Sequence, residues 1–410
     1  MFQRIYRFVE KYPSQSFLAL ALLPAVLSSI FFSFGNIGGQ HSPYYFVGYS
    51  TGFGGRKLLG TLIEPLLPAH VGHREMLPIL YSVHLVVYVL LLSFLGRINS
   101  LPSSTRTAAL AVVAVYLVSP FSFLFFIGTG ISMLYIDIWL FLLTLLFLVL
   151  FFRLRHHRIL FYLSAFIVSA VGILIHHLFC CICFPLFVSL FVYEIFSFPK
   201  LTIRRFLPAF CVCLSSLLML LCILFFGSTT DLDTLYPSIV SRCTKGVILQ
   251  ERCLWEVMYN NVPDTYFHFR YFQLLPTILL LSPLLVLFHA PWLMSIRQAK
   301  GAARWKYWLM YLSSNLLFIP VFLVASDYGR WFIAYFFIQL LLLVAMLLLE
   351  DAPLTESLLR LFSYARRYYP LSLACIVYLV LLSVSGIYYG GFNLVDDITA
   401  ALTNTPPSRL

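Results

Sequence analysis

The chain has 410 residues, of which 61% are hydrophobic and 10% are charged, and its formal net charge is +11. This composition excludes an ordinary soluble protein, because so little sequence lies outside the apolar runs that a separate soluble domain has no room. Several runs approach the ~20 residues that a bilayer-spanning helix requires. We therefore predict an all-α polytopic membrane protein with a single transmembrane domain, residues 1–410, and we expect its positive charge at a membrane surface rather than on nucleic acid.

The apolar runs predict about eleven transmembrane helices, and a basic segment without a small-residue cleavage site precedes the first, which is therefore expected to be retained. The runs are 17–34, 77–95, 107–126, 135–152, 160–175, 178–196, 206–226, 272–288, 307–325, 331–349 and 371–388. With a cytoplasmic N-terminus, 18 of the 27 Lys and Arg residues fall on inside segments. The positive-inside rule then predicts an N-in, C-out topology, with external loops near 35–76 and 227–271.

A glycine-rich stretch in the first external loop, GYSTGFGGRKLLG from Gly48 to Gly60, carries two adjacent cations, Arg56 and Lys57. Glycines let backbone N–H groups approach a ligand closely and permit positive φ angles. This combination of glycines and cations is suited to binding an anion. The alternative is that both cations extend toward lipid headgroups from the end of a short interfacial helix, 57–67.

Two further groups of polar residues are predicted at external helix ends. His176 and His177 follow the run 160–175, where a histidine is suited to act as a general base or a phosphate donor, unless the pair is merely a polar corner. The turn SDYGRW, 326–331, holds Asp327 and Arg330. Arg330 can bind a phosphate and Asp327 can accept a proton, whereas the alternative is a local ion pair beside an interfacial tryptophan.

The large external loop contains Cys243 and Cys253, which predict a disulfide if that side is oxidising; two free thiols are the alternative. Asp231 and Asp233 have the spacing of a metal-binding DxD, a pattern that chance also produces in polar loops. The other seven cysteines lie in apolar runs and are expected to pack as small hydrophobes. No Walker loop, dinucleotide fingerprint, zinc spacing or GxSxG motif occurs, which argues against a nucleotide-driven pump.

The segments GFGGRKLLGTL (52–62), IHHLFCCICFPL (175–186) and SDYGRW (326–331) resemble bacterial O-antigen and exopolysaccharide repeat-unit polymerases and related GT-C-like membrane glycosyltransferases. The resemblance implies a periplasmic-side site where arginines bind the lipid diphosphate and an acidic residue or histidine assists the acceptor. By position, Arg56 and Arg330 match the first role, and Asp327 or His177 the second. The chain departs from GT-C enzymes in its first external loop, which offers only Glu64 and Glu75, neither in a DxD.

We therefore expect an inner-membrane glycosyltransferase that polymerises polyprenyl-diphosphate-linked saccharide repeat units at the periplasmic face. The expected catalytic residues are Asp327, His177 and Glu64, and the expected diphosphate-binding residues are Arg56, Lys57 and Arg330. No cofactor is expected, with a divalent cation at Asp231 and Asp233 as the alternative. The expected partners are the polyprenyl-linked saccharide, the bilayer and other polysaccharide-assembly proteins, but no nucleic acid.

Two other functions are open. A flippase or exporter of the same lipid-linked saccharides should have polar residues at mid-membrane, whereas most predicted spans are plain Leu, Phe, Val and Ile, and no internal repeat is evident. An accessory protein without chemistry is the third reading, if Arg56 and Arg330 prove to be far apart.

Overall fold

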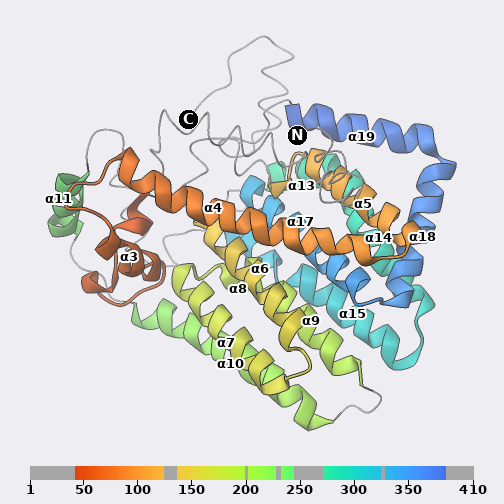
Figure 1. Cartoon of the computed structure of the whole chain (residues 1–410), viewed down its shortest axis with the longest axis horizontal. Coiled ribbons are helices and arrows are strands. Elements are labelled where there is room, and N and C mark those ends of the chain that lie inside the picture. The colour runs from red at the N-terminus through yellow and green to blue at the C-terminus, as the bar shows by residue number, and fades with distance from the viewer. Residues whose placement is uncertain are drawn as a thin grey trace, which may run out of the picture. The chain divides into compact units, whose positions relative to one another are not determined.

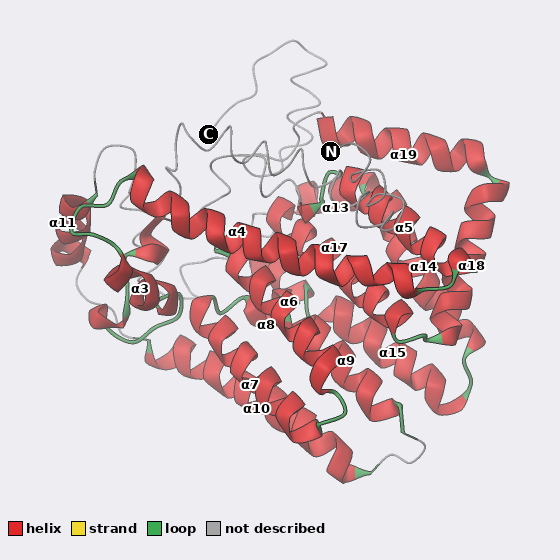
Figure 2. Cartoon of the chain, viewed as in Figure 1, coloured by secondary structure: helices red, strands yellow, loops and turns green. Residues whose placement is uncertain are grey.

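A computed structural model of the chain describes residues 42–123, 136–198, 202–227, 232–243, 271–324 and 328–384. Within these ranges the chain consists of helices joined by loops, and no strand occurs there beyond one isolated bridge between Val71 and Cys243 (Figure 1; Figure 2). The predicted all-α class is therefore confirmed for this part of the chain.

Among the described residues, five helices are long and apolar enough to cross a bilayer, and one bent helix pair raises this number to six. They are Arg74–Ser100, Asp137–Leu154, Arg158–Ile175, Ile203–Phe226 and Gly329–Leu348, with the pair Ala352–Arg367 and Tyr369–Leu382. Each of the five single helices coincides with a predicted apolar run, which supports a membrane-embedded protein; of the bent pair, only Tyr369–Leu382 does, and Ala352–Arg367 lies between two predicted runs. The count of eleven and the orientation stay predictions, and the run 17–34 lies outside the described residues.

Three of the predicted runs are interrupted in the structure. Run 178–196 divides into α8 (Phe179–Ile182) and α9 (Phe184–Phe196). Run 272–288 divides into α13 (Tyr271–Leu280) and the start of α14 (Ser282–Gln298). Run 307–325 divides into α15 (Gly301–Leu316) and α16 (Ile319–Val324). Pro185 and Pro283 lie in the first turn of α9 and α14. A proline is tolerated there but cannot extend the preceding helix, and a hydropathy window does not register such a break.

The chain divides into two compact units, of which unit 1 contains the described residues 42–96 and 136–243, and unit 2 contains 97–123 and 271–384. Unit 1 is built on four long helices, α4 (His73–Gly96), α6 (Asp137–Leu154), α7 (Arg158–Ile175) and α10 (Ile203–Phe226). Helix α6 packs against α4 and α7, and α7 packs against α10. The shorter elements of unit 1, besides α8 and α9, are η1 (Ser42–Tyr45), η2 (Tyr49–Thr51), α3 (Leu58–Ile63), η3 (Glu64–Leu66) and α11 (Leu232–Arg242).

The interior of unit 1 is rich in aromatic side chains, and α10 presents an apolar face outward. The Phe147 and Phe187 rings stack with their centroids 3.5 Å apart. Gly172 lets α7 approach α8, since a Cβ there would lie 2.5 Å from the Phe179 ring. The exposed face of α10 carries large apolar side chains, Phe206, Leu207, Phe210, Leu214, Leu217, Leu218, Phe225 and Phe226. Such a continuous apolar face is expected to contact lipid.

Unit 2 surrounds one central helix, α17 (Tyr328–Leu348), which is buried along almost its whole length. The other elements are η4 (Arg97–Ser100), α5 (Ser103–Val118), α13 to α16, α18 (Ala352–Arg367) and α19 (Tyr369–Val384). Aromatic pairs hold α17 in place: the ring centroids of Phe123 and Phe337 are 5.1 Å apart, and those of Phe288 and Phe336 are 5.7 Å apart.

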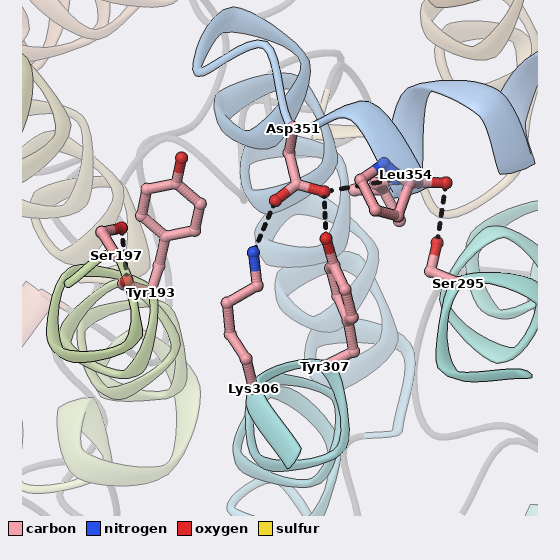
Figure 3. A network of polar contacts seen from close by, with 8 residues as sticks. Tyr193, Ser197, Ser295, Lys306, Tyr307, Asp351 and Leu354 are labelled. Carbon is pink, nitrogen blue, oxygen red and sulfur yellow. Dashed lines mark hydrogen bonds and ion pairs between the residues drawn. The ribbon is translucent and has the colours of Figure 1, made fainter. Parts of the chain in front are cut away.

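The start of α18 is fixed by a buried carboxylate, Asp351 (Figure 3). One Asp351 oxygen accepts from Lys306 Nζ at 2.7 Å, and the other accepts from the Tyr307 hydroxyl at 2.6 Å and from the Leu354 N–H at 3.3 Å. Asp351 is thus the N-cap of α18 and also an ion-pair partner of α15. Ser295 of α14 donates to Ser357 of α18 at 2.9 Å, so both α14 and α15 are joined to α18.

Candidate functional site

The glycine-rich stretch folds into a compact loop on unit 1. The residues before it, Tyr44 to Val47, are buried and anchor it. Gly60 lies against Val47 so closely that a Cβ at position 60 would meet the Val47 carbonyl oxygen at 2.2 Å. Thr61 closes the loop, because its hydroxyl oxygen accepts from the Tyr49 N–H at 2.8 Å. The predicted need for glycine is therefore explained at position 60 by a close backbone approach.

Arg56 has a left-handed backbone, with φ of 67°, although it is not a glycine. Such a conformation costs a non-glycine residue on the order of 1 kcal/mol and often marks a functional position. Its N–H donates to the carbonyl of Leu174, at the end of α7, at 3.1 Å. Its guanidinium lies 5.8 Å from the centre of the Tyr44 ring. The loop is thereby attached to the end of an apolar helix, with the cation beside that end.

Lys57 is buried and faces into the loop. Its ammonium donates to the carbonyls of Thr51 and Gly52, at 3.2 and 3.1 Å. The residue has no exposed surface, and burial lowers its pKa to about 8. These contacts indicate that Lys57 holds the loop in shape and adds positive potential, whereas Arg56 is the cation with accessible surface.

The burial of Lys57 leads to a prediction about pH. The pKa of Lys57 is about 8 in the folded protein and 10.5 ordinarily. Between pH 8 and pH 10.5, Lys57 therefore carries a proton in the unfolded chain that it has lost in the folded chain. Folding stability should therefore rise with pH across this window, by about 2 kcal/mol between pH 7 and 9.5. Denaturant unfolding in detergent at both pH values measures this rise. Lys57→Met should abolish it, and Lys300→Met, at an exposed position, should not; a rise that survives Lys57→Met would contradict the assignment.

The two predicted histidines lie next to Arg56 and differ in their roles. His176 is buried, and its Nδ1 accepts from the Leu178 N–H at 3.1 Å, which shapes the turn between α7 and α8. His177 is different, because its Nδ1 is buried and has no hydrogen-bond partner among the described residues. The pKa of His177 is well below its usual value, first because of burial and second because of the charge on Arg56. His177 is thus a neutral imidazole beside a guanidinium.

We call Arg56, the adjacent Lys57 and His177 the Arg56 site. A phosphate group accepts hydrogen bonds from a guanidinium and from a neutral imidazole N–H, and Arg56 and His177 supply these two kinds of donor. The charge on Arg56 contributes to the lowered pKa of His177, and a common ligand site for the two residues stays a prediction.

Glu64 forms an ion pair, and its predicted catalytic role stays a prediction. Its carboxylate contacts the Arg242 guanidinium of α11 at 2.5 Å. The Arg242 carbonyl also accepts from the Val71 N–H at 2.7 Å. Glu64 therefore joins the segment before α4 to α11, a link that no sequence signal indicated. Glu75 caps the start of α4, since it accepts from the Gly72 N–H at 2.7 Å.

The remaining predicted site residues are only partly described. Arg330 lies in the first turn of α17, with its guanidinium 4.9 Å from the centre of the Trp331 ring. Asp327 is outside the described residues. Because Arg56 belongs to unit 1 and Arg330 to unit 2, their predicted common site stays a prediction.

The predicted disulfide and the predicted cation site also extend beyond the described residues. Cys243 follows α11 directly, while Cys253 is outside the described ranges. Asp233 is exposed in the first turn of α11, and Asp231 is outside. Within the described part of the chain, no group of three or more His, Cys, Asp and Glu side chains is arranged to hold a metal ion.

A second polar cluster lies within unit 2, near the middle of α17, and the sequence reasoning missed it. The Tyr335 hydroxyl donates to Asn315 Oδ1 and lies 2.8 Å from His289 Nε2, while Gln339 Nε2 donates to the Ser314 carbonyl at 3.0 Å. Since Tyr335 has only one proton, His289 must donate from Nε2, which leaves His289 Nδ1 as an acceptor. His289 Nδ1 and Gln339 Oε1 are both buried without a partner among the described residues.

This cluster also explains how α15 ends inside the unit. The last turn of α15 leaves carbonyl groups that no helical N–H can reach, and Gln339 donates to one of them, the Ser314 carbonyl. Asn315, Tyr335 and Gln339 are polar residues inside predicted apolar runs, and this was the available signal.

The comparisons of this chain with protein-family models, with curated proteins and with solved structures find no match.

Proposed function

We propose that the protein acts on polyprenyl-diphosphate-linked saccharides and that the Arg56 site binds the diphosphate. The observation that carries the proposal is the position of Arg56, attached through its backbone to the end of an apolar helix and adjacent to His177, whose Nδ1 lacks a partner among the described residues. A buried hydrogen-bonding atom without a partner costs free energy, and a ligand that satisfies it recovers that cost. A phosphate at the membrane surface is such a ligand.

The chemistry that suits this site is glycosyl transfer. When a sugar leaves a polyprenyl diphosphate, negative charge develops on the departing phosphate, and a preorganised guanidinium beside it lowers the barrier. The lipid keeps that leaving group at the bilayer surface. His177 is neutral, so it can donate a hydrogen bond to the phosphate or accept a proton from the attacking hydroxyl. The proposed activity is polymerisation of repeat units at the periplasmic face of a bacterial inner membrane.

A flippase or exporter of the same lipid-linked saccharides is the second candidate. The polar cluster around Tyr335 and Gln339 favours it, because polar groups near the middle of a buried helix are what a path through the membrane requires. The helix end at Asn315, inside the unit, is a further feature of transport proteins.

Depletion of the protein in its own cells distinguishes the two functions. Loss of a polymerase should leave single lipid-linked repeat units on the outer leaflet, where added periodate oxidises their sugars in spheroplasts. Loss of a flippase should leave the same units on the inner leaflet, protected from periodate. Mass spectrometry of extracted lipids measures both, and an unchanged pool of lipid-linked saccharides would refute both candidates.

A further inference from the structure

We propose that α18 lies along the membrane surface and that the arginines at its end bind the headgroups of anionic phospholipids. The first observation is geometric. Helix α19 is apolar and exposes Leu371, Leu373, Val377 and Leu381, as a helix in contact with lipid does. Helix α18 meets it at an angle of 98° (Figure 1). If α19 crosses the bilayer, α18 runs roughly parallel to its surface.

The second observation is that α18 has two different faces. Leu354, Ser357 and Leu358 are buried, and the helix packs through this side on α14 and α5. The opposite side is exposed and carries Glu356 and Arg360, which form an ion pair at 2.6 Å. A helix with a polar exposed face and an apolar face turned toward the protein is expected at the edge of the hydrocarbon region rather than within it.

The third observation concerns the residues at the corner between the two helices. Arg366 and Arg367 are exposed, and the side chains around them are aromatic: Tyr364 is 54% exposed and Tyr369 is 69% exposed. Tyrosines of this kind typically lie at the level of the headgroups. Arginine binds phosphate through its planar fork, and the tyrosine rings cover the adjoining acyl chains.

The first turns of α18 are joined to α14 and α15 by the Ser295–Ser357 and Lys306–Asp351 contacts. The corner between α14 and α15 exposes Arg297, Lys300, Arg304 and Trp305. Within the described part of the chain, these three cations and Arg366 form no ion pair. If α18 lies along the membrane surface, exposed basic residues near both of its ends attract anionic lipids, and we name these residues, Arg297, Lys300, Arg304, Arg366 and Arg367, the basic rim.

Binding of soluble short-chain lipids to the detergent-purified protein tests the proposal. Calorimetric titration should show dioctanoyl phosphatidylglycerol binding about tenfold more tightly than dioctanoyl phosphatidylcholine. Arg366→Gln/Arg367→Gln should remove most of this preference. Arg153→Gln/Arg204→Gln, which removes the same charge from unit 1, should keep it. If both double variants lose the preference for phosphatidylglycerol equally, the preference depends only on net charge, and its assignment to the basic rim is overturned.

Two further measurements complete the test. Inorganic phosphate at the same concentration should not compete with phosphatidylglycerol; competition would indicate a free-phosphate site and not a lipid site. In opened membrane vesicles, a water-soluble maleimide should label Ser363→Cys, on the exposed side of α18, and should not label Leu381→Cys on α19, after subtraction of wild-type labelling. Equal protection of both positions would place α18 inside the bilayer and overturn the proposal.

Discussion

Replacement of Arg56 by glycine should weaken diphosphate binding strongly while leaving the protein as stable as the wild type, or slightly more stable. Charge-assisted hydrogen bonds from a guanidinium contribute roughly 1.5–3 kcal/mol each, so we expect the Kd for farnesyl diphosphate to rise at least tenfold. The backbone of Arg56 has φ of 67°, which glycine adopts without strain. Relief of about 1 kcal/mol of strain offsets the missing cation–π interaction between the guanidinium and the Tyr44 ring.

Arg56→Ala and Arg56→Lys are the matched variants. Alanine removes the cation but keeps the strained backbone, so Arg56→Ala should bind as poorly as Arg56→Gly and be less stable by about 1 kcal/mol. Lysine keeps the charge but lacks the fork that binds two phosphate oxygens, so its affinity should be intermediate. Binding is measured by titration with farnesyl diphosphate, and stability by denaturant unfolding. An unchanged Kd in Arg56→Gly would remove the main support for the proposed function.

Replacement of Asp351 by alanine should produce the largest loss of stability in unit 2, about 3–5 kcal/mol. The Asp351 side chain is 4% exposed and the Lys306 side chain 13%, so the variant leaves a cation with little access to water. The Tyr307 hydroxyl also loses its acceptor, and α18 loses its N-cap, which adds about 1 kcal/mol. The free energy of unfolding in detergent, measured by denaturant titration, checks this.

Two variants separate the ion pair from general damage to α18. Glu356→Ala breaks the exposed pair with Arg360 on the same helix and should cost less than about 1 kcal/mol. In the double variant Asp351→Ala/Lys306→Met no buried cation is left unpaired, so it should be more stable than Asp351→Ala alone. If Asp351→Ala costs no more than Glu356→Ala, the buried network does not hold α18.

The sequence alone determined the class of protein and the position of its long helices. Five apolar runs coincide with helices able to span a bilayer, because hydrocarbon thickness sets a minimum run length that the composition reveals directly. The glycine-rich stretch was also visible in the sequence, although the sequence left open whether Arg56 and Lys57 bind a ligand or extend toward lipid headgroups. Arg56 and His177 were expected to lie close together because Arg56 precedes an apolar run and His177 follows one, on the same predicted side of the membrane.

Only the tertiary structure decided which polar groups meet. The pairing of Glu64 with Arg242 joins residues 178 positions apart, and no local pattern encodes it. Lys57 differs from Arg56 because the loop folds its ammonium onto two carbonyls, which depends on backbone geometry. The cluster of His289, Asn315, Tyr335 and Gln339 forms where α15 ends and leaves the Ser314 carbonyl, to which Gln339 of α17 donates. Hydropathy averages over such single polar residues, whereas the cost of an unsatisfied buried group makes each of them specify its neighbours.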